Sequence, residues 1–482
     1  MSFLFHQSQL DVNHDKFLAE RQNTAFQNNH DFTMHDPPIV FAQQLIASDS
    51  QSDNAAGILI LHSLLKTHET SFMKNIEEKT LKRLAEIASN NNNDFQLRNQ
   101  VLNFISDLCK FSSSYTHAFW HIGFHQYLLS ILNDPNQPIL LTAPIEILSK
   151  MAVWTTFSKH ALLQLGFLDL LLKKLGEPLT IPDQYGVLFG LASIQEPVDN
   201  KSNQNIITVE QMYTIFNGVA YHIQNSNLTD QILGEAYRVI GTTMGISGNY
   251  PEFLPKISNI EEFCKYTVEL LKSRNRQDTR VKIVEFICNA IYQFDEIAQI
   301  FLKHDIINIF YDLSNTASEQ LILVLLTTIS NCIYSTDSTV SYLSESGFLS
   351  RSFDWLRAGS IKVKGDALRL FHNILNRDDK FFNSDFAMQV LNKFELLDEF
   401  CQFLILDEYE SNLLLLTSLT CIYNTIKIYN DAESEMPSPP IQKMLEEDNF
   451  EEINRLVNYN EQLIQQKAFL ILSEIKPFIP DE

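Results

Sequence analysis

Glycine and proline are scarce in this chain: its 482 residues include only 14 glycines and 15 prolines. Tight β-turns depend on these two residues, so an all-β fold with many short hairpins is not expected. Basic residues are also few, with 36 Lys and Arg against 59 Asp and Glu and a net charge of −23. Nucleic-acid binding relies on basic contacts to phosphates, so the composition predicts no direct nucleic-acid partner.

Cysteine is limited to six single residues, with no CxxC pair and no histidine at metal-ligand spacing. We therefore expect buried thiols in a reducing compartment and no bound metal. The N-terminus, MSFLFHQSQL, has no basic region followed by an apolar core, and no apolar run approaches the roughly 20 residues that span a bilayer. These absences predict a cytoplasmic and nuclear protein with no membrane contact.

Signatures of catalysis are missing as well. The sequence has no Gly-rich phosphate loop, GxSxG elbow, HExxH or kinase motif. His121 and His125 have the i, i+4 spacing of a metal-binding pair, but no third ligand accompanies them, so we expect core or surface histidines. The sequence predicts a protein that is not an enzyme and needs no cofactor.

An internal repeat is the strongest positive feature. A Gly-Phe pair or an equivalent precedes an apolar segment at four places: IGF at 122–124, LGF at 165–167, HDI at 304–306 and SGF at 346–348. Gly123 and Gly166 are 43 residues apart, which is the period of an armadillo or HEAT repeat. A residue without a Cβ at this point permits a sharp turn between two helices.

A second set of positions recurs about 16 residues before these turns, in an apolar helical stripe. We call its members the ladder residues: Ser63, Asp107, Lys150, Ser193, Thr242, Asn289, Asn331, Asn373, Asn424 and Glu474. They are 42 to 51 residues apart, all are polar, and an aliphatic or aromatic residue stands two positions before each. Because residues i and i+4 share one helix face, we expect the ladder residues to line up on the concave side of a solenoid.

The segments LLTTISNCI (325–333) and ALRLFHNIL (367–375) resemble the third helix of the armadillo repeat. About ten such repeats, from about residue 45 to the end, are similar to the importin-alpha family. The resemblance implies an all-α, right-handed superhelical armadillo (ARM)-repeat solenoid. It also implies a peptide-binding adaptor for nuclear import, which recognises an extended basic segment of the nuclear-localisation type along its concave groove.

The sequence departs from that family at two places. The family has tryptophan four residues before the asparagine, where this chain has Glu285, Thr327, Arg369 and Thr420. The family also begins with a strongly basic arm that binds the importin-beta carrier, whereas residues 1–40 contain only two basic residues against five acidic ones. Binding to an importin-beta-type carrier is therefore either absent or uses another surface.

We predict a peptide-binding site on the concave face. Its amides would bond the peptide backbone, and its carboxylates would attract lysine or arginine; the residues are Asn289, Asn331, Asn373, Asn424, Glu285, Glu146 and Asp107. One alternative is that the asparagines bond the neighbouring repeat instead. The chain would then be a divergent armadillo scaffold that assembles another protein complex, without an import role. The expected partner is a protein or peptide in both cases, and the chain is expected to be a monomer.

Composition also suggests where the domains begin and end. Residues 1–45 are polar and contain Pro37–Pro38, so we expect a flexible arm there. The solenoid is expected over 46–430, an acidic, Pro-containing loop over 431–448, and a C-terminal capping repeat over 449–482.

Overall fold

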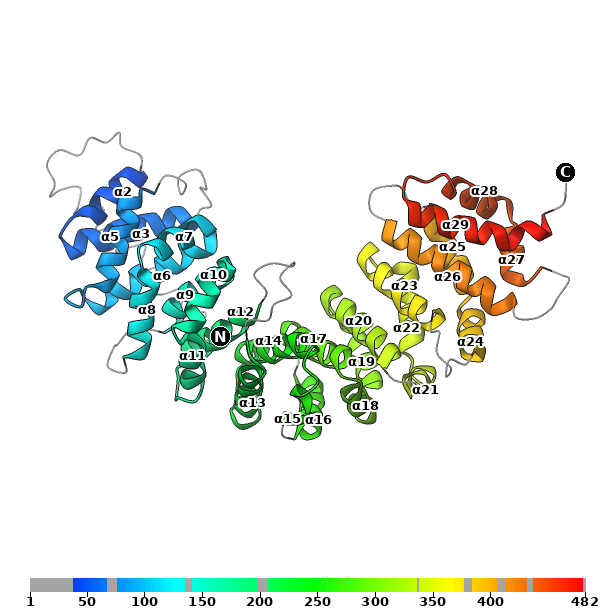
Figure 1. The fold of residues 1–482 in the computed structure, drawn as a ribbon, viewed down its shortest axis with the longest axis horizontal. Helices are drawn as coiled ribbons and strands as arrows, with labels where there is room; N and C mark the ends of the chain where they lie inside the picture. Colours follow the sequence, from blue (N-terminus) through cyan, green and yellow to red (C-terminus); the bar gives the residue numbers. More distant parts are fainter. Residues whose placement is uncertain are drawn as a thin grey trace. The chain divides into compact units, whose positions relative to one another are not determined.

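The computed structural model describes residues 38–66, 76–134, 141–196, 207–257, 259–274, 276–335, 338–376, 384–405, 412–430 and 437–479. These residues form helices, turns and bends, with no strand among them (Figure 1). They divide into two units, residues 1–204 and residues 205–482, which we describe separately. No helix in the described ranges is long and apolar enough to cross a membrane.

The helices of unit 1 are α2 (Pro38–Ala47), α3 (Gln51–Lys66), α5 (Glu78–Ser89), α6 (Phe95–Phe111), α7 (Ser113–His121), α8 (Phe124–Asn133), α9 (Thr142–Trp154), α10 (Thr156–Gln164), α11 (Phe167–Leu175) and α12 (Ile181–Gln195). The helices in the first part of unit 2 are α13 (Val209–Asn225), α14 (Asp230–Ser247), α15 (Phe253–Lys256), α16 (Ile260–Ser273), α17 (Gln277–Gln293), α18 (Asp295–Lys303), α19 (Ile306–Ser314) and α20 (Glu319–Ser335). They are followed by α21 (Ser338–Glu345), α22 (Phe348–Ala358), α23 (Ile361–Leu375), α24 (Ser384–Phe394), α25 (Leu396–Gln402), α26 (Asn412–Asn430), α27 (Pro439–Met444), α28 (Glu447–Leu456) and α29 (Gln462–Ile475). Short 3-10 turns follow α25 at Phe403–Ile405 and α29 at Lys476–Phe478.

Each ladder residue lies on one helix of a three-helix repeat. We call these the ladder helices: α3, α6, α9 and α12 in unit 1, and α14, α17, α20, α23, α26 and α29 in unit 2. Within each unit, every ladder helix packs against the next one along the chain (Figure 1). The 42- to 51-residue period therefore corresponds to a physical stack of repeats, as the sequence predicted.

The apolar stripe beside the ladder residues forms the core. Nine of the ten residues that stand two positions before a ladder residue are fully buried, from Leu61 in α3 to Ile422 in α26. The exception is Leu472, because α29 buries Ile471 and Ile475 instead. The predicted frame is thus one residue out of register at Glu474.

Left-handed residues make the predicted turns between helices. Gly123 (φ 77°) precedes α8, Gly166 (φ 81°) precedes α11, and Asp305 (φ 63°) takes the same conformation before α19. Gly347 differs, since its φ is −74°. There a Cβ would lie 2.5 Å from the ring of Tyr311, so glycine serves close packing and not a left-handed turn.

Two of the expected segment boundaries differ from the structure. Helix α2 begins at Pro38, inside the range expected to be a flexible arm, and buried Gln43 accepts bonds from Glu77 N (2.8 Å) and Thr80 Oγ1 (2.9 Å) of the α5 region. Proline suits the first turn of a helix, where its missing N–H needs no partner. Helix α27 also lies inside the expected loop at 431–448, with Ile441 and Met444 buried. Residues 1–37 and 431–436 lie outside the described residues.

Candidate functional site

Asn289 and Asn331 both lie on ladder helices and reach back to the preceding ladder helix. Asn289 Nδ2 donates to Gly241 O of α14 at 3.0 Å. Asn331 Nδ2 lies 3.5 Å from Cys288 O and 3.3 Å from Cys288 Sγ of α17. A side-chain amide can make four hydrogen bonds, and these bonds use only the amide nitrogens of the two half-buried residues.

Asn373 and Asn424 are in a different situation. Asn373 is 6% exposed, and its Oδ1 accepts from Tyr334 Oη at 3.0 Å. Asn424 Nδ2 donates to Oδ1 of Asn376, just after α23, at 3.0 Å. The structure thus brings all four predicted asparagines onto consecutive ladder helices and gives each a bond between repeats, but it buries Asn373.

The three predicted carboxylates already have partners. Asp107 Oδ2 lies 2.9 Å from His62 Nε2, and this hydrogen bond holds the pKa of Asp107 below its usual value. Glu146 Oε2 lies 2.7 Å from Lys110 Nζ of α6 and accepts from Ser106 Oγ at 2.6 Å.

Glu285 pairs with Lys282 at 2.8 Å on its own helix. Asp107 and Glu146 lie in unit 1, whereas Glu285 and the four asparagines lie in unit 2. The predicted carboxylates and asparagines all lie on ladder helices. Each of the three carboxylates, however, already interacts with a neighbouring basic side chain.

Two exposed tyrosines occupy a repeat position that the sequence analysis did not consider. Tyr292 and Tyr334 each stand three residues after a ladder asparagine, and they are 70% and 54% exposed. On a helix, the positions three after and four before a residue share its face. The tyrosines therefore lie beside Asn289 and Asn331 on the same helix face, one turn toward the C-terminal end of the helix. The position where importin-alpha proteins have tryptophan lies one turn toward the N-terminal end. The recurring Asn-x-x-Tyr spacing was the signal that could have identified them.

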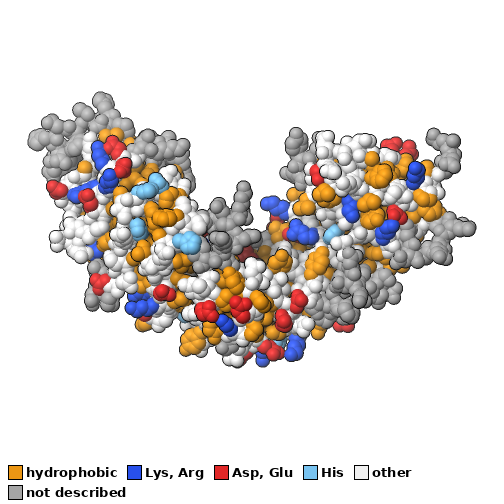
Figure 2. Space-filling view, viewed as in Figure 1, with side chains coloured by type: hydrophobic (Ala, Val, Ile, Leu, Met, Phe, Trp, Pro, Cys, Tyr) orange, Lys and Arg blue, Asp and Glu red, His pale blue; other side chains and the backbone are white. Residues whose placement is uncertain are grey.

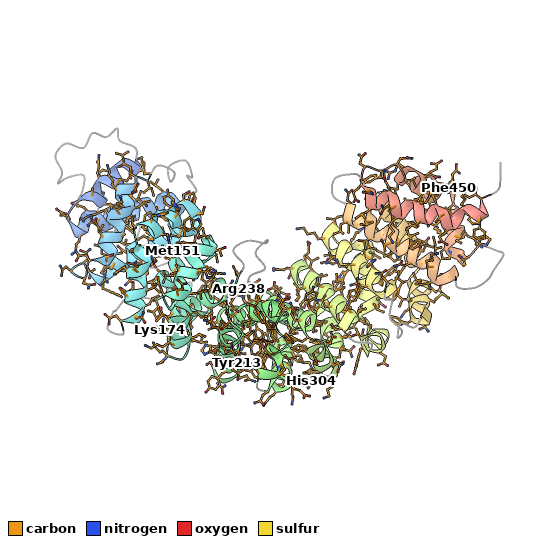
Figure 3. All side chains as sticks on the ribbon, viewed as in Figure 1. Met151, Lys174, Tyr213, Arg238, His304 and Phe450 are labelled. Carbon is orange, nitrogen blue, oxygen red and sulfur yellow. The ribbon has the colours of Figure 1, made fainter. Side chains whose placement is uncertain are left out.

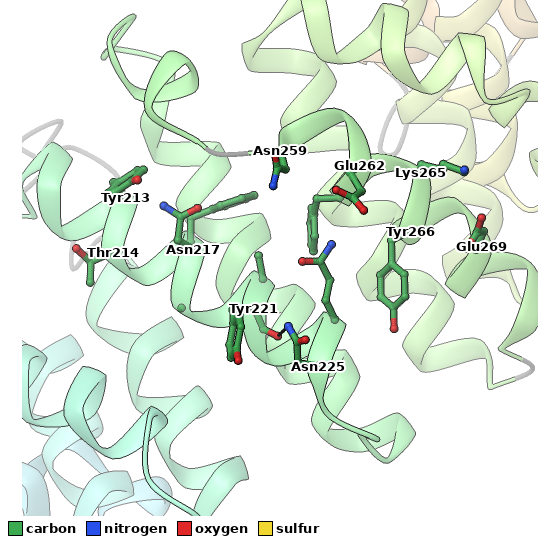
Figure 4. Close-up of a pocket in the computed structure, with 15 residues that line it drawn as sticks. Tyr213, Thr214, Asn217, Tyr221, Asn225, Asn259, Glu262, Lys265, Tyr266 and Glu269 are labelled. Carbon is green, nitrogen blue, oxygen red and sulfur yellow. Dashed lines mark hydrogen bonds between the residues drawn. The ribbon is translucent and has the colours of Figure 1, made fainter.

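The opposite layer of unit 2 contains a groove of about 880 Å³ between α13 and α16 (Figure 4). Tyr213, Asn217 and Tyr221 line it from α13, and Glu262 and Tyr266 line it from α16. Figure 3 shows Tyr213 on the side of unit 2 away from Arg238 of the ladder helix α14. The lining combines phenol and amide groups with the charged side chains of Glu262, Lys265 and Glu269.

His121 and His125 are a surface and a core histidine: His121 is exposed, and His125 is buried and stacks on Trp120 with ring centroids 4.1 Å apart. His121 Nε2 lies 2.7 Å from His117 Nε2, one turn earlier on α7. In the described part of the chain, no group of three or more His, Cys, Asp or Glu could hold a metal ion.

The six cysteines are free and buried. Burial raises the pKa of Cys109, and that of Cys332 and Cys401, to about 12. Thiols with such a pKa are poor nucleophiles at neutral pH. The described residues therefore offer no nucleophilic thiol.

Solved structures match this arrangement of repeats. An engineered protein aligns with 92% of this chain and 99% of its own length, at 13% identity and a TM-score of 0.66. A structure concerned with the interaction between cadherin and β-catenin covers 91% of this chain and 86% of its own, at 13% identity and a TM-score of 0.58. A designed armadillo repeat protein covers 54% of this chain and 99% of its own, at 17% identity and a TM-score of 0.43.

No family model matches the chain, and no curated protein matches its sequence. At such low identities, structural likeness establishes the fold alone. The fold is all-α and consists of armadillo repeats, as predicted. The resemblance to importin-alpha stays a prediction.

Proposed function

We propose that this protein is a non-enzymatic scaffold that binds an extended peptide segment of a partner along the ladder helices of unit 2. The observation that carries the proposal is the pair of exposed rings, Tyr292 and Tyr334, at equivalent positions of the adjacent helices α17 and α20. Tyrosine combines a large apolar ring with a polar tip, and it is enriched at protein interfaces.

The chemistry beside these rings suits a peptide backbone. Asn289 and Asn331 keep carbonyl oxygens that can accept peptide N–H groups, while their amide nitrogens bond the preceding helix. Packed helices lie about 8 to 10 Å apart, which an extended chain spans with about three residues. A peptide that crosses α17 and α20 would thus meet a ring and an amide at regular intervals.

The likeness of fold adds a precedent. One of the similar structures concerns the interaction of β-catenin with cadherin, which is a protein–protein interaction. The monomeric state expected from the sequence fits this role, since each unit buries its core within one chain.

A second and more specific candidate function is that of an import adaptor, which binds a basic nuclear-localisation segment and moves between cytoplasm and nucleus. The consecutive ladder asparagines support it, and Glu285 adds a carboxylate on α17. Its carboxylate is already paired with Lys282, so a basic peptide would have to compete with that lysine.

The test is a selection from a random 12-residue peptide display library on the immobilised full chain. Binding of selected peptides to Tyr292→Ser and Tyr334→Ser variants would then be compared with binding to Tyr221→Ser. Tyr221 is 69% exposed, but it lies on α13 in the other layer of unit 2. Loss of binding in the first two variants alone supports the proposal. Selected peptides that bind all three variants equally well would contradict it, and enrichment of Lys/Arg-rich peptides would favour the import adaptor.

A further inference from the structure

We propose that the ladder helices α23, α26 and α29 recognise an acidic stretch of the bound segment, in place of the basic one expected from the sequence. This inference rests on the proposed function. The three helices together contain five Lys and Arg residues against two Asp and Glu, in a chain whose net charge is −23. Figure 2 shows several Lys and Arg side chains over this part of unit 2, with Asp and Glu side chains among them.

Among the described residues, carboxylate partners are present for only two of the five basic residues. Arg369 pairs with Asp366 at 3.2 Å, and Lys427 pairs with Glu474 across α26 and α29. These two pairs use both acidic residues of the three helices. Lys362, Lys364 and Lys467 form no ion pair with any described residue. Their excess positive charge is left for a ligand.

Two of the five basic side chains lie over one aromatic ring. Lys467 Nζ of α29 lies 4.9 Å from the ring centre of Tyr423, and Lys427 Nζ of α26 lies 5.5 Å from the same ring. A ring attracts cations through its electron-rich face, so Tyr423 holds two ammonium groups near each other. His372 of α23 lies close enough that the charge of Lys467 adds to burial in lowering its pKa.

Lys427 shares its charge with Glu474, so Lys467, together with Lys362 and Lys364, supplies the positive charge for an anion with several acceptor oxygens. Carboxylate and phosphate groups share this chemistry, and both occur in acidic peptide segments. The surface continues from α17 and α20 through successively packed ladder helices, so one extended segment could reach both parts. About three extended residues would separate the groups that meet adjacent helices.

Peptides from the display selection provide the test. Those that need Tyr292 would be titrated against the full chain and against a Lys362→Gln, Lys467→Gln double variant. Neither lysine has a carboxylate partner, so the change leaves no described acid unpaired. The matched control is Lys265→Gln, Lys272→Gln, which removes two exposed lysines of α16 that likewise have no carboxylate partner among the described residues.

We expect the selected peptides to be acidic, and the double variant to bind them about tenfold or more weakly at 50 mM salt, with a smaller difference at 500 mM. The control should change affinity less than about twofold. Copies with serine or phosphoserine at the acidic positions would distinguish a carboxylate ligand from a phosphate ligand. Neutral or basic peptides that need Tyr292, or acidic ones that bind the double variant equally well, would overturn this inference and leave the proposed function intact. Selected peptides that bind independently of Tyr292 and Tyr334 would overturn both.

Discussion

Asn289 donates a hydrogen bond to the carbonyl oxygen of Gly241, 48 residues earlier in the chain, at 3.0 Å. One turn further along the same two helices, Gln293 Nε2 donates to Gly245 O at 2.8 Å. A Cβ at Gly241 would lie 3.4 Å from Phe286 Cα, an ordinary van der Waals distance, so α17 and α14 lie close together at this point. The close approach brings the backbone of α14 within reach of short amide side chains.

The same relation recurs in other repeats. Asp107 bonds His62, which directly precedes the ladder residue Ser63. Asn331 contacts Cys288, which directly precedes the ladder residue Asn289. A ladder residue therefore has a structural role between repeats, which was the alternative left open by the sequence. Its remaining acceptor can still take part in binding.

The bond from Asn289 predicts a measurable loss of stability on truncation. Asn289→Ala should lower the free energy of unfolding by about 1 kcal/mol, because it removes one hydrogen bond between part-buried groups. Urea denaturation followed by circular dichroism would measure the change. Asn225→Ala is the control, since exposed Asn225 bonds only Tyr221 O of its own helix and should change stability by less than about 0.5 kcal/mol. Equal effects of the two substitutions would show that the bond between repeats adds nothing.

Much of the fold could be predicted because helical periodicity and burial are local properties. The residues two positions before the ladder residues are buried in nine of ten repeats, since a fixed helical period repeats the same face. The exception is Leu472, which is only part-buried and lies after the longer connection between α26 and α29. The start of α2 at Pro38 could not be predicted, because a proline that opens a helix looks the same in sequence as one that ends a helix.

The site could be predicted only in part. The sequence placed the four asparagines on one set of helices, but it could not show that Asn373 is buried under Tyr334. Such a contact depends on how far two helices approach each other. The carboxylate partners Lys110 and His62 were likewise hidden, because each pair joins residues about 40 positions apart.

Tyr292 should contribute binding energy without contributing much to folding. Its ring is 70% exposed, so Tyr292→Ser should change the free energy of unfolding by less than about 0.5 kcal/mol. Loss of an aromatic contact at the centre of an interface costs about 1 to 2 kcal/mol, so peptide affinity should fall about 5- to 30-fold. Fluorescence anisotropy with a selected peptide would measure it. An unchanged affinity, with Tyr221→Ser as reference, would remove Tyr292 from the binding surface.

Replacing glycine by alanine should lower the stability of the protein at one end of helix α11 and raise it at the other end. Gly166 has a φ of 81°, and a Cβ there would meet no atom within 4 Å, so Gly166→Ala costs only the left-handed backbone, about 1 to 2 kcal/mol. Gly176 has a φ of −83°, and its nearest contact would be 3.5 Å away. Gly176→Ala should therefore stabilise the protein by about 0.4 to 1 kcal/mol, because alanine lowers the conformational entropy of the unfolded chain. Thermal unfolding of both variants would test this, and a loss of stability in Gly176→Ala would contradict it.

Lys159 of α10 is a buried amine in unit 1. Its side chain is 3% exposed, and Nζ donates to Glu196 O just after α12. Burial disfavours the charged form and lowers the pKa of Lys159 to about 8. Below pH 8 the native protein therefore carries a charge that it solvates poorly, and this reduces stability relative to a neutral side chain.

This amine predicts a pH-dependent difference between the wild-type protein and Lys159→Met. At pH 7 the variant should be more stable by about 1 to 3 kcal/mol, because each unit of pKa shift is worth about 1.4 kcal/mol and the lost bond to Glu196 O offsets part of the gain. Between pH 8 and about 10.5 the unfolded chain keeps the proton that the native state has lost, so wild-type stability rises with pH relative to the variant. The difference should therefore narrow across this window. Urea denaturation at several pH values would measure it, with exposed Lys173→Met on α11 as the control. A difference that stays constant from pH 7 to 10.5 would mean that the native pKa of Lys159 is not lowered.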